Sequence, residues 1–276
     1  MMIAGFIGTG SMGSILIEAF IQSGALDPKQ IIASNRTPDK VDQLAKLYPG
    51  LERAQSNIDV VSKSDLIFLC IKPGEYKKVI DEIQLALLPS QIVVSITSVV
   101  AISQLEQLLP AKISKVIPSI TNYVLSGAAL CMYGSRIDND DQVLLEHLLA
   151  HISSPIRIAE ENTRICSDLS SCGPAFFSFL IQCFIDAAVK ETGIPYAEAR
   201  LLASEMILGT GKLLTTGGFT PVALQQRVSV PGGVTAEGIS VLQSELQGVF
   251  NRVVQATHTK YKEDLDKSEI SLGFKV

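Results

Sequence analysis

The sequence predicts a two-domain α/β protein, in which an N-terminal Rossmann domain with a doubly wound, mainly parallel sheet is followed by an all-α domain. Three observations lead to this fold class. Short β-type runs alternate with amphipathic segments from Met2 to about Ala159, which is the rhythm of βαβ units. A glycine-rich loop directly follows the first run. From Glu160 onward the pattern is helical, so the domains are expected to span residues 1–160 and 161–276.

The strands are expected where short runs of β-branched and other apolar residues are bounded by turn-forming residues. These runs are residues 3–8, 31–35, 66–71, 92–96, 115–118 and 155–158. Amphipathic segments such as 15–22 and 41–47 lie between them and are expected to be helices on the faces of the sheet. The segment after about Lys262 is charged and has no clear apolar period, so we expect it to fray.

The composition argues against several classes of partner. The 276 residues include 28 acidic and 23 basic side chains without a basic cluster, which disfavours nucleic acid. The five cysteines form no C-x-x-C pair and show no zinc-ligand spacing, and His147 and His151 lie four residues apart without a third ligand. We therefore expect no metal site, no disulfide and a reducing, cytoplasmic location.

The longest apolar stretch, residues 175–189, is interrupted by Gln182 and Asp186 and is short for a membrane span. The first residues show no basic region or cleavage site of a signal peptide. We expect a buried helix of a soluble protein and no membrane partner. Because 47% of the residues are hydrophobic and only 18% are charged, a monomer would expose an unusually apolar surface, which predicts a homo-oligomer.

The glycine-rich loop lies between the first strand and a helical segment, which is the context of a dinucleotide-binding fingerprint. Its residues are Gly8, Thr9, Gly10, Ser11, Met12 and Gly13. The first glycine permits the tight turn, the second lets a pyrophosphate approach the backbone, and the third lets the helix pack closely. The free N–H groups of the helix N-terminus then face the phosphate. The alternative is an ordinary glycine-rich turn.

The end of the second strand indicates which dinucleotide is bound. Folds that prefer NAD place Asp or Glu there to bind the ribose 2′-hydroxyl, whereas this chain has Ser34, Asn35, Arg36 and Thr37. An arginine among short polar side chains is suited to a 2′-phosphate. NADP(H) is therefore favoured over NAD(H), although an exposed arginine in a turn is the simpler alternative.

Two further loops allow two interpretations each. Cys70, Ile71, Lys72 and Pro73 close a strand at the edge where ligands bind in doubly wound sheets, but Lys-Pro is also a common helix start. In the helical domain, Ser229-Val230-Pro231-Gly232-Gly233-Val234-Thr235 could present backbone N–H groups and a hydroxyl to a carboxylate. It could equally be a simple connector between helices.

Taken together, these motifs resemble the pyrroline-5-carboxylate reductases, over nearly the whole chain. The resemblance rests on the glycine loop, Ser34-Asn35-Arg36, Ile71-Lys72-Pro73, Ser170-Ser171-Cys172-Gly173-Pro174-Ala175 and residues 228–235, in the family's order and spacing. It implies a Rossmann half and a helical half, of the type found at the C-terminus of 6-phosphogluconate dehydrogenase. The helical half would form the homodimer, or a larger assembly built on it.

The resemblance also implies roles for individual residues. NADP(H) would be held by the glycine loop, Ser34, Asn35, Arg36, Asn57 and the loop from Cys70 to Pro73. A cyclic imino acid would be held by Ser119, Gly232, Gly233 and Thr235, with Ser229 and Thr235 as the catalytic residues. The reaction would be hydride transfer to the C=N carbon of pyrroline-5-carboxylate, giving proline, as in proline biosynthesis. Such chemistry needs mainly alignment from the protein.

Several positions depart from the family pattern where the substrate is expected to lie. Ile117-Pro118-Ser119-Ile120-Thr121 replaces Met-Pro-Asn-Thr-Pro, Val230 replaces the second serine of Ser-Ser-Pro-Gly-Gly, and Gly218 replaces an acidic residue often found near the imine. Each lost hydrogen bond to a buried group costs about 1–3 kcal/mol, so turnover could fall by orders of magnitude. This profile is similar to that of the late-competence ComER group of diverged paralogues.

Three functions follow as hypotheses. The first is an NADPH-dependent imine reductase. The second is a diverged paralogue that binds NADP(H), has little reductase activity and serves a regulatory, late-competence-like role. The third is a β-hydroxyacid dehydrogenase, a class whose members resemble one another in carrying a catalytic lysine early on the first long helix after the Rossmann domain. It is disfavoured because residues 174–188 contain no lysine and Lys190 lies at the far end of that helix.

Overall fold

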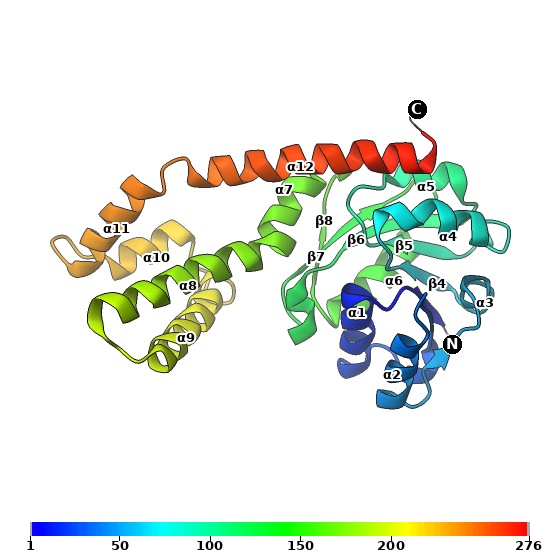
Figure 1. The fold of residues 1–276 in the computed structure, drawn as a ribbon, viewed down its shortest axis with the longest axis horizontal. Coiled ribbons are helices and arrows are strands. Elements are labelled where there is room, and N and C mark those ends of the chain that lie inside the picture. Colours follow the sequence, from blue (N-terminus) through cyan, green and yellow to red (C-terminus); the bar gives the residue numbers. More distant parts are fainter. Residues whose placement is uncertain (1, 275–276) are drawn as a thin grey trace. The chain divides into compact units, whose positions relative to one another are not determined.

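The computed structural model describes residues 2–274 and contains a single eight-stranded sheet with the order β3-β2-β1-β4-β5-β6-β7-β8 (Figure 1). All neighbouring strands are parallel except the antiparallel pair β6 and β7. The strands are β1 (Ala4–Ile7), β2 (Ile31–Ser34), β3 (Glu52–Arg53), β4 (Leu66–Leu69), β5 (Ile92–Ser95), β6 (Lys112–Ile117), β7 (Ala128–Tyr133) and β8 (Ser154–Arg157). The predicted doubly wound, mainly parallel sheet is confirmed.

Helices cover both faces of the sheet because successive strand residues point to opposite sides. In β4, Leu66 and Phe68 join one apolar cluster with α1 (Ser11–Gln22), α2 (Asp39–Leu47) and α6 (Asn139–Ala150). Ile67 and Leu69 join a second cluster with α3 (Asn57–Lys63), α4 (Tyr76–Ile83) and α5 (Ile102–Leu108). Continuous apolar runs are expected of strands that are buried on both faces.

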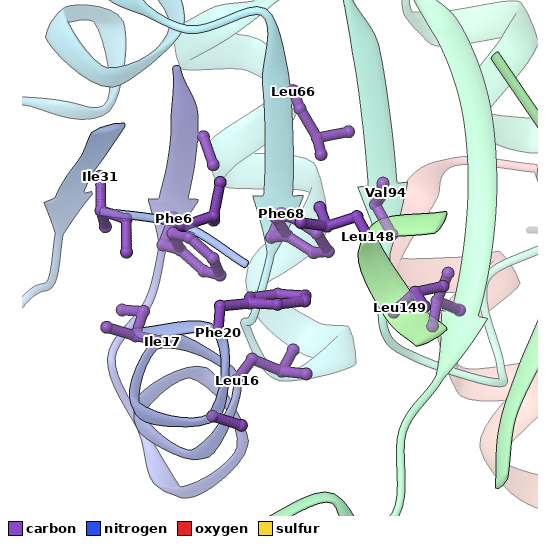
Figure 2. Packing of buried hydrophobic residues seen from close by; sticks show 14 of the residues in the cluster. Phe6, Leu16, Ile17, Phe20, Ile31, Leu66, Phe68, Val94, Leu148 and Leu149 are labelled. Atoms are coloured by element: carbon purple, nitrogen blue, oxygen red, sulfur yellow. The ribbon is translucent and has the colours of Figure 1, made fainter. Parts of the chain in front are cut away.

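Three aromatic rings hold α1 on the sheet. Figure 2 shows Phe6, Phe20 and Phe68 grouped on one face, with Leu16 and Ile17 of α1 beside them. Phe6 and Phe68 stack with ring centroids 4.8 Å apart, and Phe20 is tilted against both. Because all three side chains are fully buried, the direction of α1 is fixed along its length, and so is the position of its N-terminus.

The chain forms two compact units, one of residues 1–174 with 256–276 and one of residues 175–255. The second unit is helical. It contains most of α8 (Gly173–Thr192), all of α9 (Tyr196–Leu214), α10 (Pro221–Val228) and α11 (Val234–Glu245), and the start of α12 (Val249–Leu272). Its small buried cluster consists of Ile185, Ala199 and Ala203, and many large apolar side chains lie outside it.

The boundary between these units differs from the predicted one at residues 160/161. The turn at Glu160 is bound to the first unit, since its Oε1 accepts hydrogen bonds from Lys115 Nζ at 2.5 Å and from the amide of Ile102 at 2.9 Å. The following helix α7 (Thr163–Ser167) and a π-helical turn (Asp168–Cys172) also pack within this unit. The change to helical pattern at residue 160 therefore precedes the structural boundary by about one helix.

The prediction that the tail frays after Lys262 is wrong. Helix α12 continues to Leu272, which is 3% exposed in the apolar cluster on the α3–α5 face. Ser268, one turn earlier, is also buried. Because only a narrow stripe of the helix is covered, its sequence shows charged residues and no apolar period.

A buried polar cluster holds α12 against α7. Asp168, only 5% exposed, accepts hydrogen bonds from Arg164 Nη2 at 2.8 Å and from Thr257 Oγ1 at 2.6 Å. The Arg164 guanidinium lies 5.6 Å from the ring centroid of Tyr261, whose hydroxyl donates to the Ser98 carbonyl at 2.9 Å. The cluster therefore joins α7, α12 and the loop after β5.

By length and composition alone, the stretch Glu160–Thr192 is long and apolar enough to cross a membrane. The buried Arg164–Asp168 ion pair and the π-helical turn lie within it. The family resemblance implies that a second copy of the chain, and not a membrane, covers the apolar surface of this stretch.

Replacement of Asp168 with Ala is expected to lower the free energy of unfolding of the first unit by about 3–5 kcal/mol, because it leaves a buried guanidinium without its carboxylate. Urea unfolding followed by circular dichroism measures this. As a control, Asp81→Ala removes the exposed Lys77–Asp81 pair and should cost about 1 kcal/mol or less. Equal effects of the two substitutions would contradict a stabilising role for the Asp168 cluster.

Candidate cofactor site

A cleft of about 590 Å³ lies at the carboxyl edge of β1, β2 and β4. The chain reverses direction across the sheet between β1 and β4, and ligands bind at such switch points in doubly wound folds. Nine of the predicted cofactor residues line the cleft, namely Gly8, Gly10, Ser34, Asn35, Arg36, Asn57, Cys70, Ile71 and Lys72.

The three glycines of the loop occupy positions with different steric requirements. Gly8 has φ +101°, and a Cβ there would lie 2.4 Å from the carbonyl oxygen of Cys70. A Cβ on Gly13 would lie 2.2 Å from the carbonyl oxygen of Gly8. A Cβ on Gly10 would meet no protein atom within 4 Å. Gly8 and Gly13 are therefore required by the fold, whereas the space beside Gly10 is open for a ligand.

Helix α1 begins directly at this open space. Its N-cap is Gly10, which provides no side-chain cap, so the first-turn N–H groups of Ser11, Met12 and Gly13 are left for another acceptor. Thr9, which is buried, is fixed by its amide, which donates to Asn35 Oδ1 at 3.0 Å. This arrangement fits a pyrophosphate at a helix N-terminus.

A hydrogen-bond chain connects the loops of the cleft. The Gly8 amide donates to the Ser34 carbonyl at 2.8 Å, and Ser34 Oγ donates to Asn57 Oδ1 at 2.6 Å. Asn57 Nδ2 in turn donates to Glu82 Oε2 on α4 at 2.8 Å. The ends of β1, β2, α3 and α4 are thus held in a defined arrangement around the cleft.

The charged side chains that line the cleft are mainly cationic. Five basic side chains line it, Arg36, Lys40, Arg53, Lys72 and Lys78, against two carboxylates, Glu75 and Glu82. Arg36 is largely exposed and lies 3.3 Å from Glu75, while Arg53 is paired with Asp42 at 2.9 Å. The excess of positive charge suits the 2′-phosphate of NADP(H).

The loop from Cys70 to Pro73 begins a helical turn, as one interpretation expects, and it lies at the edge of the sheet where the other interpretation expects a ligand. Lys72 caps a short 3₁₀ turn, Pro73–Glu75, with the proline at its first position, and Ile71 and Lys72 also line the cleft. Burial raises the pKa of the Cys70 thiol, so the group stays protonated at neutral pH. Its backbone carbonyl, packed against Gly8, is the part that shapes the loop.

Ser119 lies in the first unit and is only 1% exposed. Its hydroxyl donates to the Ser170 carbonyl at 3.1 Å and accepts from Thr121 Oγ1 at 2.9 Å. Ser171 Oγ similarly donates to the Pro118 carbonyl at 3.0 Å. These bonds join the loop after β6 to the π-helical turn, and the hydroxyl of Ser119 is occupied by protein groups.

The remaining predicted residues lie in the second unit, between α10 and α11. Ser229 caps the end of α10, and Gly232 has φ +73°. Gly233 is the N-cap of α11 without a side-chain cap, and Thr235 lies in the first turn. A Cβ on Gly233 would lie 2.9 Å from Val230 Cγ2, so this glycine is required by the loop itself.

Residues 2–274 contain no group of three or more His, Cys, Asp or Glu side chains that could hold a metal ion. His151 Nδ1 lies 2.9 Å from the carbonyl oxygen of His147. This local contact gives the histidine a structural partner on α6.

Several cleft residues were not predicted from the sequence. Lys40 and Arg53 come from α2 and the short strand β3, and Glu75, Lys78 and Glu82 from the turn before α4 and from α4 itself. The helical spacing of residues 75, 78 and 82 is a usable signal, because side chains three and four apart share one face. That spacing does not indicate which face meets the cleft.

The two helix-side glycines provide a matched test of the loop. Gly10→Ala is expected to change the free energy of unfolding by only about 0.5 kcal/mol but to weaken NADPH binding about tenfold or more. Gly13→Ala is expected to destabilise the first unit by about 1–3 kcal/mol, because its methyl group overlaps the Gly8 carbonyl. Thermal unfolding and fluorescence titration with NADPH measure the two effects. Unchanged NADPH affinity in Gly10→Ala would argue against this loop as the pyrophosphate site.

Comparison with known proteins identifies relatives of both units. Residues 160–264 match the family model for pyrroline-5-carboxylate reductase dimerisation. Residues 3–99 match a model described as NADP oxidoreductase, coenzyme F420-dependent. The second match agrees with NADP(H) as the expected cofactor.

Curated relatives align over most of the chain. ComE operon protein 4 of Bacillus subtilis is 45% identical over 261 residues, covering 95% of this chain and 96% of its own. Pyrroline-5-carboxylate reductase of Escherichia coli is 32% identical over 265 residues, covering 95% and 97%. Pyrroline-5-carboxylate reductase 3 of Danio rerio is 34% identical over 245 residues, covering 87% and 83%.

A solved structure agrees with these relationships. A pyrroline-5-carboxylate reductase from Coxiella burnetii superposes with a TM-score of 0.87 at 27% identity, over 95% of this chain and 98% of that one. The predicted fold class and family resemblance are therefore confirmed. The chain belongs to the pyrroline-5-carboxylate reductase family of NAD(P)-dependent oxidoreductases.

Proposed function

We propose that this protein is an NADPH-dependent reductase of a cyclic imino acid, with pyrroline-5-carboxylate as substrate and proline as product. The observation that carries the proposal is the cleft, whose open space at Gly10 leads to the first-turn amides of α1 and whose charged lining is mainly cationic. Family membership supplies the reaction class, and the E. coli relative is named for this activity.

In this proposal the first unit holds the dinucleotide. The amides of residues 10–13 would bind the pyrophosphate, and Arg36 would bind the 2′-phosphate. Asn57, which is hydrogen-bonded to Ser34 and Glu82, would form one wall of the adenosine pocket. Ile71 and Lys72 would form the opposite wall. NADPH supplies the hydride when bound, while the protein contributes alignment.

The loop between α10 and α11 would hold the substrate carboxylate. The N–H of Gly232 and the uncapped first turn of the twelve-residue helix α11 would face it, and Thr235 adds a hydroxyl. The Gly233 amide donates to the Val230 carbonyl at 2.9 Å, so Gly233 would contribute through the shape of the loop. A helix N-terminus favours an anion. Ser229 and Thr235 would orient the ring within this loop.

A second candidate is a paralogue that binds NADP(H) but has little reductase activity and serves a regulatory, late-competence-like role. The 45% identity to ComE operon protein 4 favours it, as do Val230 and Gly218 at substrate-side positions of the family pattern. The occupied hydroxyl of Ser119 supports the same candidate, because it offers a substrate less than the family's asparagine would.

We further propose that the protein is a cytoplasmic homodimer formed through the helical unit. Large apolar side chains of α8 and α9 are more than half exposed in the single chain, namely Phe177, Phe179, Phe184, Leu201 and Leu202. Exposed apolar area of this extent normally marks an interaction surface. The family model that covers these helices is one of dimerisation.

The two candidate functions differ in turnover. We expect purified protein to oxidise NADPH when pyrroline-5-carboxylate is added and to produce proline, detected by chromatography. Thr235→Ala should reduce kcat/KM about tenfold to a hundredfold, by roughly 1–3 kcal/mol of lost hydrogen bonding. Folded, NADPH-binding protein without turnover at millimolar substrate would instead favour the regulatory paralogue.

The proposed dimer can be tested by sedimentation equilibrium. The unmodified protein should sediment as a dimer or a multiple of it, and Phe184→Asp should shift the equilibrium toward monomer because it buries a charge in an apolar interface. Leu85→Asp, at a 95% exposed position of the first unit, is the control. A monomeric unmodified protein at micromolar concentration would argue against the proposal.

A further inference from the structure

We propose that Glu75 determines how strongly the site discriminates between NADPH and NADH, by occupying Arg36 when no 2′-phosphate is present. This inference rests on the proposed cofactor site. It assigns a role to a carboxylate that lies in the cleft but outside the residues carried over from the family.

The geometry joins two segments that are distant in the sequence. Arg36 follows β2, whereas Glu75 ends the 3₁₀ turn before α4, and Arg36 Nη1 lies 3.3 Å from Glu75 Oε1. Both side chains line the same cleft. The guanidinium therefore has a carboxylate partner at the place where the 2′-substituent of the ribose is expected.

Arg36 can exchange the Glu75 carboxylate for a phosphate group. The Arg36 side chain is 82% exposed and that of Glu75 is 42% exposed, so solvent screens their attraction and neither is held by packing. A phosphate offers an arginine a bidentate, more strongly charged acceptor. Arg36 can therefore exchange Glu75 for the phosphate, and loss of the pair lowers the affinity for NADPH by a factor of up to about five.

The charge of Glu75 also acts directly on the ligand. A carboxylate beside a 2′-phosphate repels it, whereas a carboxylate beside a 2′-hydroxyl has no charge to oppose and accepts its hydrogen bond. Glu75 thus disfavours NADPH relative to NADH, and Arg36 favours it. The balance of these two side chains sets the preference.

The other carboxylate of the cleft is differently placed. Glu82 accepts a hydrogen bond from Asn57 Nδ2 at 2.8 Å, and Asn57 is held by Ser34. This carboxylate supports the wall of the cleft. Of the two, Glu75 is the one paired with the arginine that is suited to phosphate.

The test compares Glu75→Gln with Asp81→Asn. Asp81 lies on α4, the helix whose N-cap residue is Glu75. It is paired with Lys77 and is not among the residues that line the cleft, so its substitution removes the same charge from the same part of the chain. Dissociation constants for NADPH and NADH are measured by the fluorescence of the reduced nicotinamide. We expect Glu75→Gln to tighten NADPH binding about threefold to tenfold, to change NADH binding less than twofold or weaken it, and Asp81→Asn to leave the ratio unchanged.

A double-variant cycle with Arg36→Gln completes the test. Arg36→Gln alone should weaken NADPH binding selectively, and adding Glu75→Gln to it should then tighten NADPH less than in the parent protein. Equal effects of Glu75→Gln on both cofactors, or equal effects of Glu75→Gln and Asp81→Asn, would overturn the role of Glu75. If Arg36→Gln spares NADPH binding, the proposed 2′-phosphate site itself is wrong, and the inference falls with it.

Discussion

The architecture of the first unit depends on the close contact of three backbone segments, the loop after β1, the start of α1 and the end of β4. There is no room for a Cβ at Gly8 or Gly13. A Cβ on Gly8 would lie 2.4 Å from the carbonyl oxygen of Cys70, and a Cβ on Gly13 would lie 2.2 Å from that of Gly8. This contact places the N-terminus of α1 at the carboxyl edge of the sheet, and the stacked rings of Phe6 and Phe68, with Phe20, fix its direction. The geometry available to a phosphate follows from these constraints.

The cofactor cleft and the loop proposed to hold the substrate are built differently. The cofactor cleft is closed by a chain of hydrogen bonds through Ser34, Asn57 and Glu82, so each wall supports the next. The loop proposed to hold the substrate, in the second unit, is local, since a Cβ on Gly233 would meet Val230 only three residues away. Local loops tolerate substitution more readily than interlocked ones, which agrees with the family departure at Val230 and the retained glycine loop. The departure at Ser119 does not follow this pattern, because that residue is buried and hydrogen-bonded to Ser170 and Thr121.

The parts of the fold and site that were predicted from the sequence are those with a local physical cause. The glycine loop follows a short apolar run, and the strand, the loop and the helix are contiguous in the sequence. Strand β7 was missed because Ala128–Tyr133 contains no β-branched residue, and β3 because it has only two residues. Glu75 and Glu82 reach the cleft through the packing of α4, which no short pattern encodes. The docking of α12 was mispredicted because only one narrow stripe, including Ser268 and Leu272, is covered.

The return of α12 also affects the order in which the protein can be completed during translation. The first unit consists of residues 1–174 and 256–276, and Leu272 belongs to its apolar core. A nascent chain therefore exposes the helical unit from the ribosome before the nucleotide-binding unit has its last core residue. Chains that terminate within residues 175–255 carry a full glycine loop but lack the partners of Asp168 on α12. The first unit is therefore expected to reach its full stability only after residue 272 has been synthesised.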